Sequence, residues 1–180
     1  MRKIIALLCA ALLLLSSAAL ADTAAIDYFD RFEIRGTIPD GWHSTILSQS
    51  DMDLDGDIRP DADDPASAYM TVNICFNETY ASVGTLKDLS ETEMNLLLQT
   101  FDEYTVAFDT LETDTGVSLL VARETGDDQD FLVLYTIWQG YEIELTLLAG
   151  EAVPGRVLTD AQIGSCLSYA KSLGISAVAQ

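Results

Sequence analysis

Residues 51–64 read DMDLDGDIRPDADD and contain seven aspartates, a density of carboxylates that suits a divalent cation. In calcium loops of the EF-hand type, alternate carboxylates converge on one ion and a glycine at the sixth position permits a sharp turn. Gly56 occupies that sixth position, and Ile58 occupies the eighth, where an aliphatic residue anchors the loop. The pattern predicts one calcium site whose candidate ligands are Asp51, Asp53, Asp55, Asp57, Asp61 and Asp63.

The match to a calcium loop is partial. Position twelve holds Ala62 in place of a bidentate glutamate, and no helical pattern flanks the segment. The alternative is a loop of solvated aspartates that mutual repulsion keeps extended, and both interpretations stay open. No phosphate-binding loop, dinucleotide fingerprint, H-E-x-x-H or C-x-x-C motif is present, so no other cofactor is predicted.

Two glutamates and one histidine are the remaining candidates for chemistry. Glu142 and Glu144 lie two residues apart on a predicted strand, so their carboxylates share a face and could act as a general acid and base. The ordinary alternative is an exposed strand face. His43 has no G-x-S-x-G elbow to complete a triad. We therefore predict no catalytic residue and keep a carboxylate-dependent hydrolase as the rival hypothesis.

The first 21 residues have the pattern of a secretory signal. Two cations precede an apolar run over residues 4–15, and small residues end the segment at Ala19-Leu20-Ala21. The run is too short to span a bilayer, and no stop-transfer segment follows. We expect a bacterial protein that is exported, extracellular or periplasmic, and not inserted in a membrane. Residues 22–180 are expected to form a single domain.

The charge of the chain limits the classes of partner that it can bind. The chain has nine Lys and Arg and 29 Asp and Glu, which gives a net charge of −20. Loss of the signal removes two of the cations and no acid. A charge of about −22 repels nucleic acid and anionic lipid, which excludes both as partners. Basic partners and cations remain. Frequent apolar residues in periodic runs exclude a disordered chain.

Two cysteines remain after the signal, Cys75 and Cys166. In an oxidising compartment they could form a disulfide, and the alternative is two buried free thiols. Because Cα spacing cannot be read from the sequence, both stay open.

Periodicity predicts an α+β domain. Alternating or continuous apolar runs indicate strands at residues 28–38, 42–50 and 68–77 and four more between residues 105 and 149. Capping boxes at Ser90 with Glu93 and at Thr159 with Gln162 start two helices, the first over residues 91–103. The segment FLVLYTIW is apolar at nearly every position, which favours a strand covered on both faces. We expect an antiparallel sheet of about six or seven strands packed with helices.

The order of these elements resembles the PsbP-like α/β/α sandwich, which includes bacterial DcrB-like exported proteins. The similarity lies in IPDGW at residues 38–42, the mid-chain helix, and YTIWQGYEIELTLLAG before the last helix. It implies that Pro39, Gly41 and Trp42 shape a turn and plug the core, and that Gly140 joins the last two strands. Such proteins are mostly non-enzymatic accessory or interaction proteins. The resemblance thus implies a secreted binding or accessory domain for an unknown protein or small ligand, and a purely structural extracellular domain is a further alternative.

Overall fold

The computed structural model describes residues 23–28, 32–50, 52–101, 105–125 and 129–177. The predicted signal, residues 1–21, lies outside these ranges. Within them, no helix is both long enough and apolar enough to cross a bilayer.

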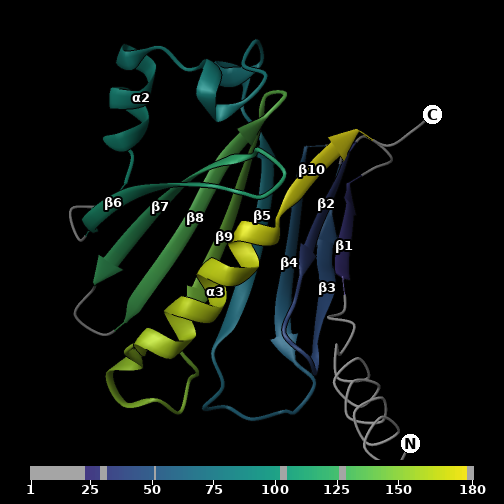
Figure 1. Cartoon of the computed structure of the whole chain (residues 1–180), viewed down its shortest axis with the longest axis vertical. Coiled ribbons are helices and arrows are strands. Elements are labelled where there is room, and N and C mark those ends of the chain that lie inside the picture. The colour runs from purple at the N-terminus through teal and green to yellow at the C-terminus, as the bar shows by residue number, and fades with distance from the viewer. Residues whose placement is uncertain (1–22, 29–31, 51, 102–104, 126–128, 178–180) are drawn as a thin grey trace, which may run out of the picture.

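A seven-stranded antiparallel sheet forms the centre of the molecule, as the sequence predicts. Its strand order is β3-β4-β5-β9-β8-β7-β6, so the last four strands form a meander whose end strand joins β5 (Figure 1). The strands are β3 (Trp42–Gln49), β4 (Asp53–Pro60), β5 (Tyr69–Phe76), β6 (Thr105–Glu112), β7 (Ser118–Thr125), β8 (Asp130–Trp138) and β9 (Tyr141–Leu148).

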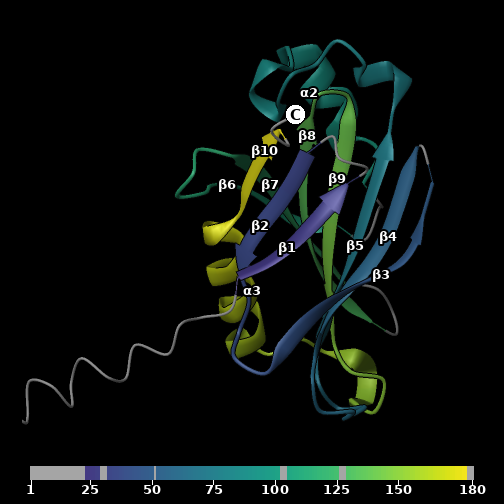
Figure 2. The ribbon, with the colours of Figure 1, turned by 90° about the vertical axis from the view of Figure 1, so that its right-hand side faces the viewer.

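A second, three-stranded sheet of order β1-β2-β10 packs on the first and is not anticipated as a separate layer. Phe32 and Ile34 of β2 are buried, and the Phe32 ring lies 5.4 Å from the ring of Tyr141 on β9. Figure 2 shows this sheet, beside α3, in front of the central strands. Its strands are β1 (Thr23–Tyr28), β2 (Phe32–Thr37) and β10 (Gly174–Ala177).

In the described part of the chain, two α-helices lie on opposite faces of the main sheet, and both begin at the predicted capping boxes. Helix α3 (Asp160–Ser172) and the small sheet cover what we call the α3 face. Helix α2 (Glu91–Leu98) and two short 3₁₀ helices, η1 (Glu78–Tyr80) and η2 (Leu86–Asp88), pack over β7 and β8 on the other side, the α2 face. A third, η3 (Pro154–Arg156), precedes α3. The first helix ends at Leu98, earlier than the predicted residue 103.

Alternation along the strands separates the two faces. On β5, Met70, Val72 and Ile74 are buried on the α3 face, while Asn73 and Cys75 point to the α2 face. Strand β8 is buried on both sides over nearly its whole length, as its continuous apolar sequence predicts.

The acidic segment is a strand where a coiled loop was predicted. Residues 53–60 form β4, paired with β3 and β5 on either side. Leu54 and Ile58, four residues apart on one face of the strand, are fully buried. Their burial favours an extended backbone, which the pattern of aspartates alone did not indicate. Gly56 allows β3 and β4 to approach closely, because a Cβ there would lie 2.8 Å from the carbonyl oxygen of Thr45.

Candidate functional site

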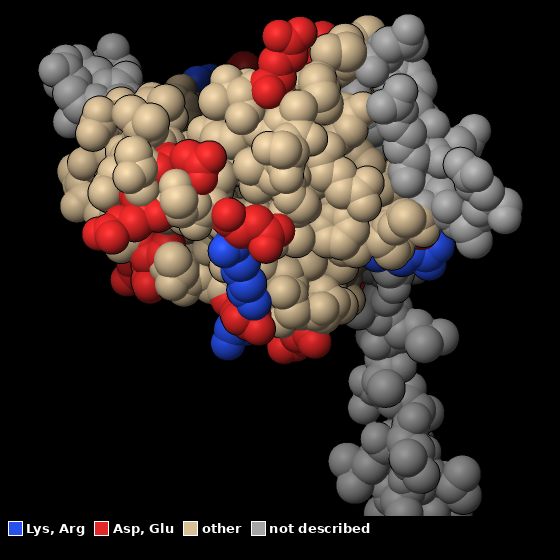
Figure 3. Space-filling view, turned by 90° about the horizontal axis from the view of Figure 1, so that it is seen from above, with Lys and Arg blue, Asp and Glu red and all other residues tan. Residues whose placement is uncertain are grey.

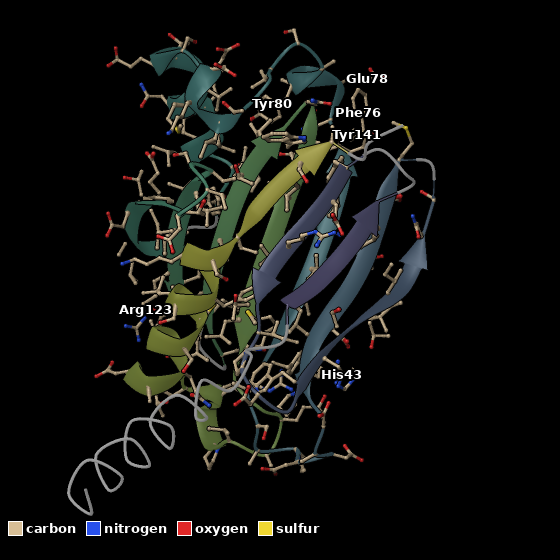
Figure 4. The ribbon with its side chains drawn as sticks, turned by 45° about the vertical axis from the view of Figure 1, so that its right-hand side comes forward. His43, Phe76, Glu78, Tyr80, Arg123 and Tyr141 are labelled. Atoms are coloured by element: carbon tan, nitrogen blue, oxygen red, sulfur yellow. The ribbon has the colours of Figure 1, made fainter. Side chains whose placement is uncertain are left out.

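An apolar cavity of about 470 Å³ opens between the first half of α3, the β2–β3 turn and the β4–β5 loop. We call it the α3 pocket. It lies at the end of the sheet where Figure 4 shows His43, and Phe76 and Tyr141 lie at the opposite end. Its lining includes six large side chains: Pro39, Trp42, Pro60, Met70, Leu147 and Tyr169.

The β2–β3 turn holds Trp42 in place. Gly41 adopts a positive φ of 75°, which a residue with a side chain rarely adopts, and the Trp42 amide donates to the Pro39 carbonyl at 3.2 Å. The Asp61 amide donates to the Gly41 carbonyl at 2.7 Å and ties the turn to the next loop. Trp42 is half-buried against the core, which agrees with the plug that the PsbP-like resemblance implies.

The loop that forms the opposite wall is also fixed by hydrogen bonds. The Asp64 carboxylate accepts from the Ala66 amide at 3.0 Å and from the Ser67 hydroxyl at 3.2 Å. The Ala152 amide donates to the Pro65 carbonyl at 2.9 Å, which anchors the loop to the segment before α3. The walls of the pocket therefore exist before any ligand arrives.

The polar groups of the pocket are neutral, and those of Gln162 and Ser165 already have hydrogen-bond partners. Gln162 accepts from the Thr159 amide at 2.8 Å in the capping box, and the Ser165 hydroxyl donates to the Ala161 carbonyl at 3.0 Å. Burial raises the pKa of Cys166 to about 12, so this thiol stays protonated at neutral pH. The lining offers no ionised base or nucleophile, and it suits a neutral apolar group.

The five predicted calcium ligands that the structure describes do not share one centre. Along an extended strand, side chains two positions apart are separated by about 6.6 Å and do not converge. The Asp55 carboxylate accepts from the Ser48 hydroxyl at 2.9 Å and from the Asn73 amide at 2.8 Å. Asp53 accepts from the Ser50 hydroxyl at 2.5 Å.

The other candidate ligands lie further along the chain. Asp57 is buried in an ion pair with Arg59, and Asp61 lies 2.8 Å from Nδ1 of His43. Asp63 lines a different hollow, and Asp51 lies outside the described residues. No three His, Cys, Asp or Glu side chains converge on a metal position in the described part of the chain. The coiled geometry is thus wrong, and calcium binding stays a prediction.

Glu142 and Glu144 do share the α2 face, but each carboxylate has its own partners. Glu142 accepts from the Tyr135 hydroxyl at 2.5 Å and from the Asn77 amide at 2.9 Å. Glu144 accepts from the Thr146 hydroxyl at 2.9 Å. Burial and the bond to Glu142 raise the pKa of Tyr135, which fixes this hydroxyl as a donor. Neither glutamate lines the α3 pocket.

The two cysteines are free thiols in the structure. They lie on opposite faces of the main sheet: Cys166 Sγ is 3.7 Å from Met70 Sδ on the α3 face, and Cys75 Sγ is 3.6 Å from Glu142 on the α2 face. A disulfide between them would have to pass through the sheet, so of the two interpretations that the sequence left open, the structure favours free thiols.

The PsbP-like resemblance implied that Trp42 fills the core, but sequence reasoning did not identify the α3 pocket. Its walls come from three separate segments, and only the tertiary fold brings them together. The available signal was the run PDADDPASA at residues 60–68, of which Pro60, Ala66 and Ala68 line the pocket together with the small residues Ala161 and Ser165 of the last helix.

No protein-family model and no curated protein sequence matches the chain. Among solved structures, the chain is similar to the solution structure of cyanobacterial PsbP (CyanoP) from Synechocystis sp. PCC 6803, with a TM-score of 0.50. The match covers 89% of this chain and 96% of that chain at 16% sequence identity, so it concerns the fold. The chain has the PsbP-like α+β fold that its sequence predicts.

Proposed function

We propose that the mature chain is an exported, non-enzymatic binding domain that accepts an apolar group of its partner in the α3 pocket. The observation that carries this proposal is the preformed apolar cavity of about 470 Å³. Its size lies within the range of roughly 300–1,000 Å³ that is typical of ligand sites.

Two further observations support binding over the alternatives. The carboxylates of Glu142 and Glu144, on which a hydrolase would depend, are bonded to Tyr135, Asn77 and Thr146 away from the pocket. A purely structural domain needs no open apolar cavity, since an unfilled one costs packing energy.

The pocket is tested with a neutral apolar dye, N-phenyl-1-naphthylamine, whose fluorescence rises in apolar surroundings. Ala161→Phe places a large ring at the pocket lining and should abolish saturable binding. The chain contains two tryptophans, and a Trp138→Phe background leaves Trp42 as the sole donor for energy transfer to the bound dye. We expect transfer from Trp42 in this background.

Ala107→Phe is the matched control, because Ala107 is exposed on the edge strand β6 and makes the same change in size. It should leave dye binding unchanged. Equal binding by wild type and Ala161→Phe, or the absence of saturable binding, would contradict the proposal.

Calcium binding and export are separate proposals. If residues 51–63 bind calcium, millimolar calcium should raise the Tm of the wild type, and Asp53→Asn with Asp55→Asn should remove the rise. An unchanged Tm would mean that the hydrogen bonds of Asp55 to Ser48 and Asn73 are more favourable than binding of the ion.

Export predicts a mature N-terminus at Asp22, which N-terminal sequencing of the secreted protein would check.

A further inference from the structure

The α3 pocket belongs to a longer groove. A shallower hollow of about 700 Å³ follows α3 and shares Pro39, Ala161 and Tyr169 with the pocket. A third, of about 200 Å³, lies beyond Pro60 and Ser67, which it also shares. The three adjoin one another through these shared residues, and the α3 pocket, the most apolar of them, lies in the middle. An extended occupant fits this shape better than a compact one.

The margin of the groove is acidic. Five exposed carboxylates lie beside it or immediately next to residues that line it: Asp40, Asp61, Asp63, Asp64 and Asp160. Two arginines near this margin already have partners. Arg59 pairs with Asp57 and lies over the Tyr69 ring. Arg156 donates to Gln129 at 2.8 Å and lies 3.8 Å from Glu151. Asp61 lies 2.8 Å from His43, so the charge without an ion-pair partner at the margin is that of Asp40, Asp63, Asp64 and Asp160, and it is negative.

Charge alone does not distinguish this end of the molecule. Acidic side chains also gather on the opposite end, over α2 and its surroundings (Figure 3). The groove differs because an apolar cavity lies between the acidic groups, and a partner must therefore match both properties at once.

We infer that the groove along α3 binds an extended, cationic segment of a partner protein, with one large apolar side chain in the α3 pocket and Lys or Arg residues beside the acidic margin. This inference rests on the proposed binding function and adds the class of partner. The apolar anchor supplies burial, and the flanking cations supply orientation and rate of association, which salt screens.

Three dye-labelled peptides test the inference by fluorescence anisotropy at low ionic strength: Gly-Lys-Lys-Phe-Lys-Lys-Gly, Gly-Lys-Lys-Ser-Lys-Lys-Gly and Gly-Glu-Glu-Phe-Glu-Glu-Gly. We expect the first to bind about tenfold more tightly than either of the others. Ala161→Phe should abolish its binding, and added salt should weaken it. Equal affinity for the cationic and anionic phenylalanine peptides would overturn the inference.

Matched charge variants locate the effect. Asp40→Asn, Asp61→Asn and Asp63→Asn together should weaken the cationic phenylalanine peptide about tenfold. Glu78→Gln, Glu91→Gln and Asp109→Asn change the net charge equally at exposed positions outside the groove and should have little effect. An equal loss in both triple variants would show a general attraction to an acidic protein and would overturn the inference.

The dye separates this inference from the proposed function. If the neutral dye binds in the pocket but the peptides do not discriminate by charge, the partner class is wrong and the binding function stands. If neither dye nor peptide responds to Ala161→Phe, both are wrong. Selection of random heptapeptides on the wild type, with counter-selection on Ala161→Phe, should enrich aromatic or aliphatic residues flanked by Lys or Arg. Enrichment of acidic flanks would also overturn the inference.

Discussion

The two faces of strands β4, β5 and β9 are built from neighbouring residues and differ sharply in composition. On β9, Ile143 and Leu145 are each 1% exposed on the α3 face, whereas Glu144 and Thr146 are half-buried on the α2 face. Successive side chains of a strand point to opposite sides, so one short sequence builds both surfaces. The α3 face is covered by a helix and a second sheet, and the α2 face is covered mainly over β7 and β8.

The difference shows that a face of the sheet is apolar where a helix or a second sheet packs on it and polar where no described element does. Where α2 does not reach, a polar ladder crosses four strands in register, formed by Ser48, Asp55, Asn73 and Glu144. Apolar residues there would expose a large patch and promote association. The same strands turn Leu54, Val72 and Leu145 into the core on the other side.

The largest expected difference between the faces comes from two adjacent residues of β9. Leu145→Ala removes a buried side chain from the α3 face and should lower the free energy of unfolding by about 3 kcal/mol. Thr146→Ala removes one hydroxyl that donates to Glu144 and should cost about 0.5 kcal/mol. Urea unfolding measures both, and similar costs would mean that the α2 face is packed as tightly as the core.

Alkaline pH should distinguish the two thiols, which lie on opposite faces of the sheet. Burial raises the pKa of Cys166 from 9.0 to about 12, so between these values the unfolded chain releases a proton that the folded chain keeps. Stability from this group is complete below pH 9 and is lost as pH rises through that window, by at most about 1.4 kcal/mol per pH unit. Urea unfolding at a series of pH values should show a smaller slope for Cys166→Ala than for wild type.

Cys75 provides the matched control on the other face. Burial and, after it, the Glu142 carboxylate raise its pKa to about 11, but its side chain is only half-buried. Cys75→Ala should therefore change the slope less than Cys166→Ala. In the native protein a thiol reagent should modify Cys75 before Cys166. The reverse order of labelling would contradict the assignment of these faces.

The sequence predicted most of the fold because its main signals are local. The capping boxes at Ser90 and Thr159 start α2 and α3, and alternation or continuous apolar runs marked β5, β8 and β9. It failed at β4, because aspartates at every second position fit a calcium loop and a half-buried strand equally well. Burial of Leu54 and Ile58 decides between them, and burial depends on partners distant in sequence.

The small sheet and the α3 pocket could not be predicted from local sequence patterns, because both depend on contacts between residues distant in sequence. Strand β10 has only four residues, and its pairing with β2 spans almost the whole chain. The pocket combines Trp42, Met70 and Tyr169, which only the tertiary fold brings together. Of the candidate ligands, the structure locates five and joins none of them into a shared centre.

Tyr135→Phe probes the boundary where the α2 face changes from apolar to polar. The hydroxyl of Tyr135 donates to Glu142 at 2.5 Å, and the ring belongs to the apolar cluster under α2. Its loss leaves a half-buried carboxylate with one donor fewer and should cost about 1–2 kcal/mol in urea unfolding. In a Glu142→Gln background the same substitution should cost less, and an undiminished cost would mean that the hydroxyl acts through other contacts.

The smallest expected change in stability comes from Gly→Ala substitutions on the packed side and on the open side of α3. Gly164 faces the open groove, and a Cβ there would meet no atom within 4 Å. Gly164→Ala should therefore raise the free energy of unfolding by about 0.5–1 kcal/mol, because glycine is a poor residue in a helix interior. Gly36 of β2 lies on the packed side, where a Cβ would overlap the Tyr169 ring and lie 2.9 Å from Leu173 Cδ2. Gly36→Ala should lower the Tm while Gly164→Ala raises it, and a loss of stability in both would mean that the groove is already filled.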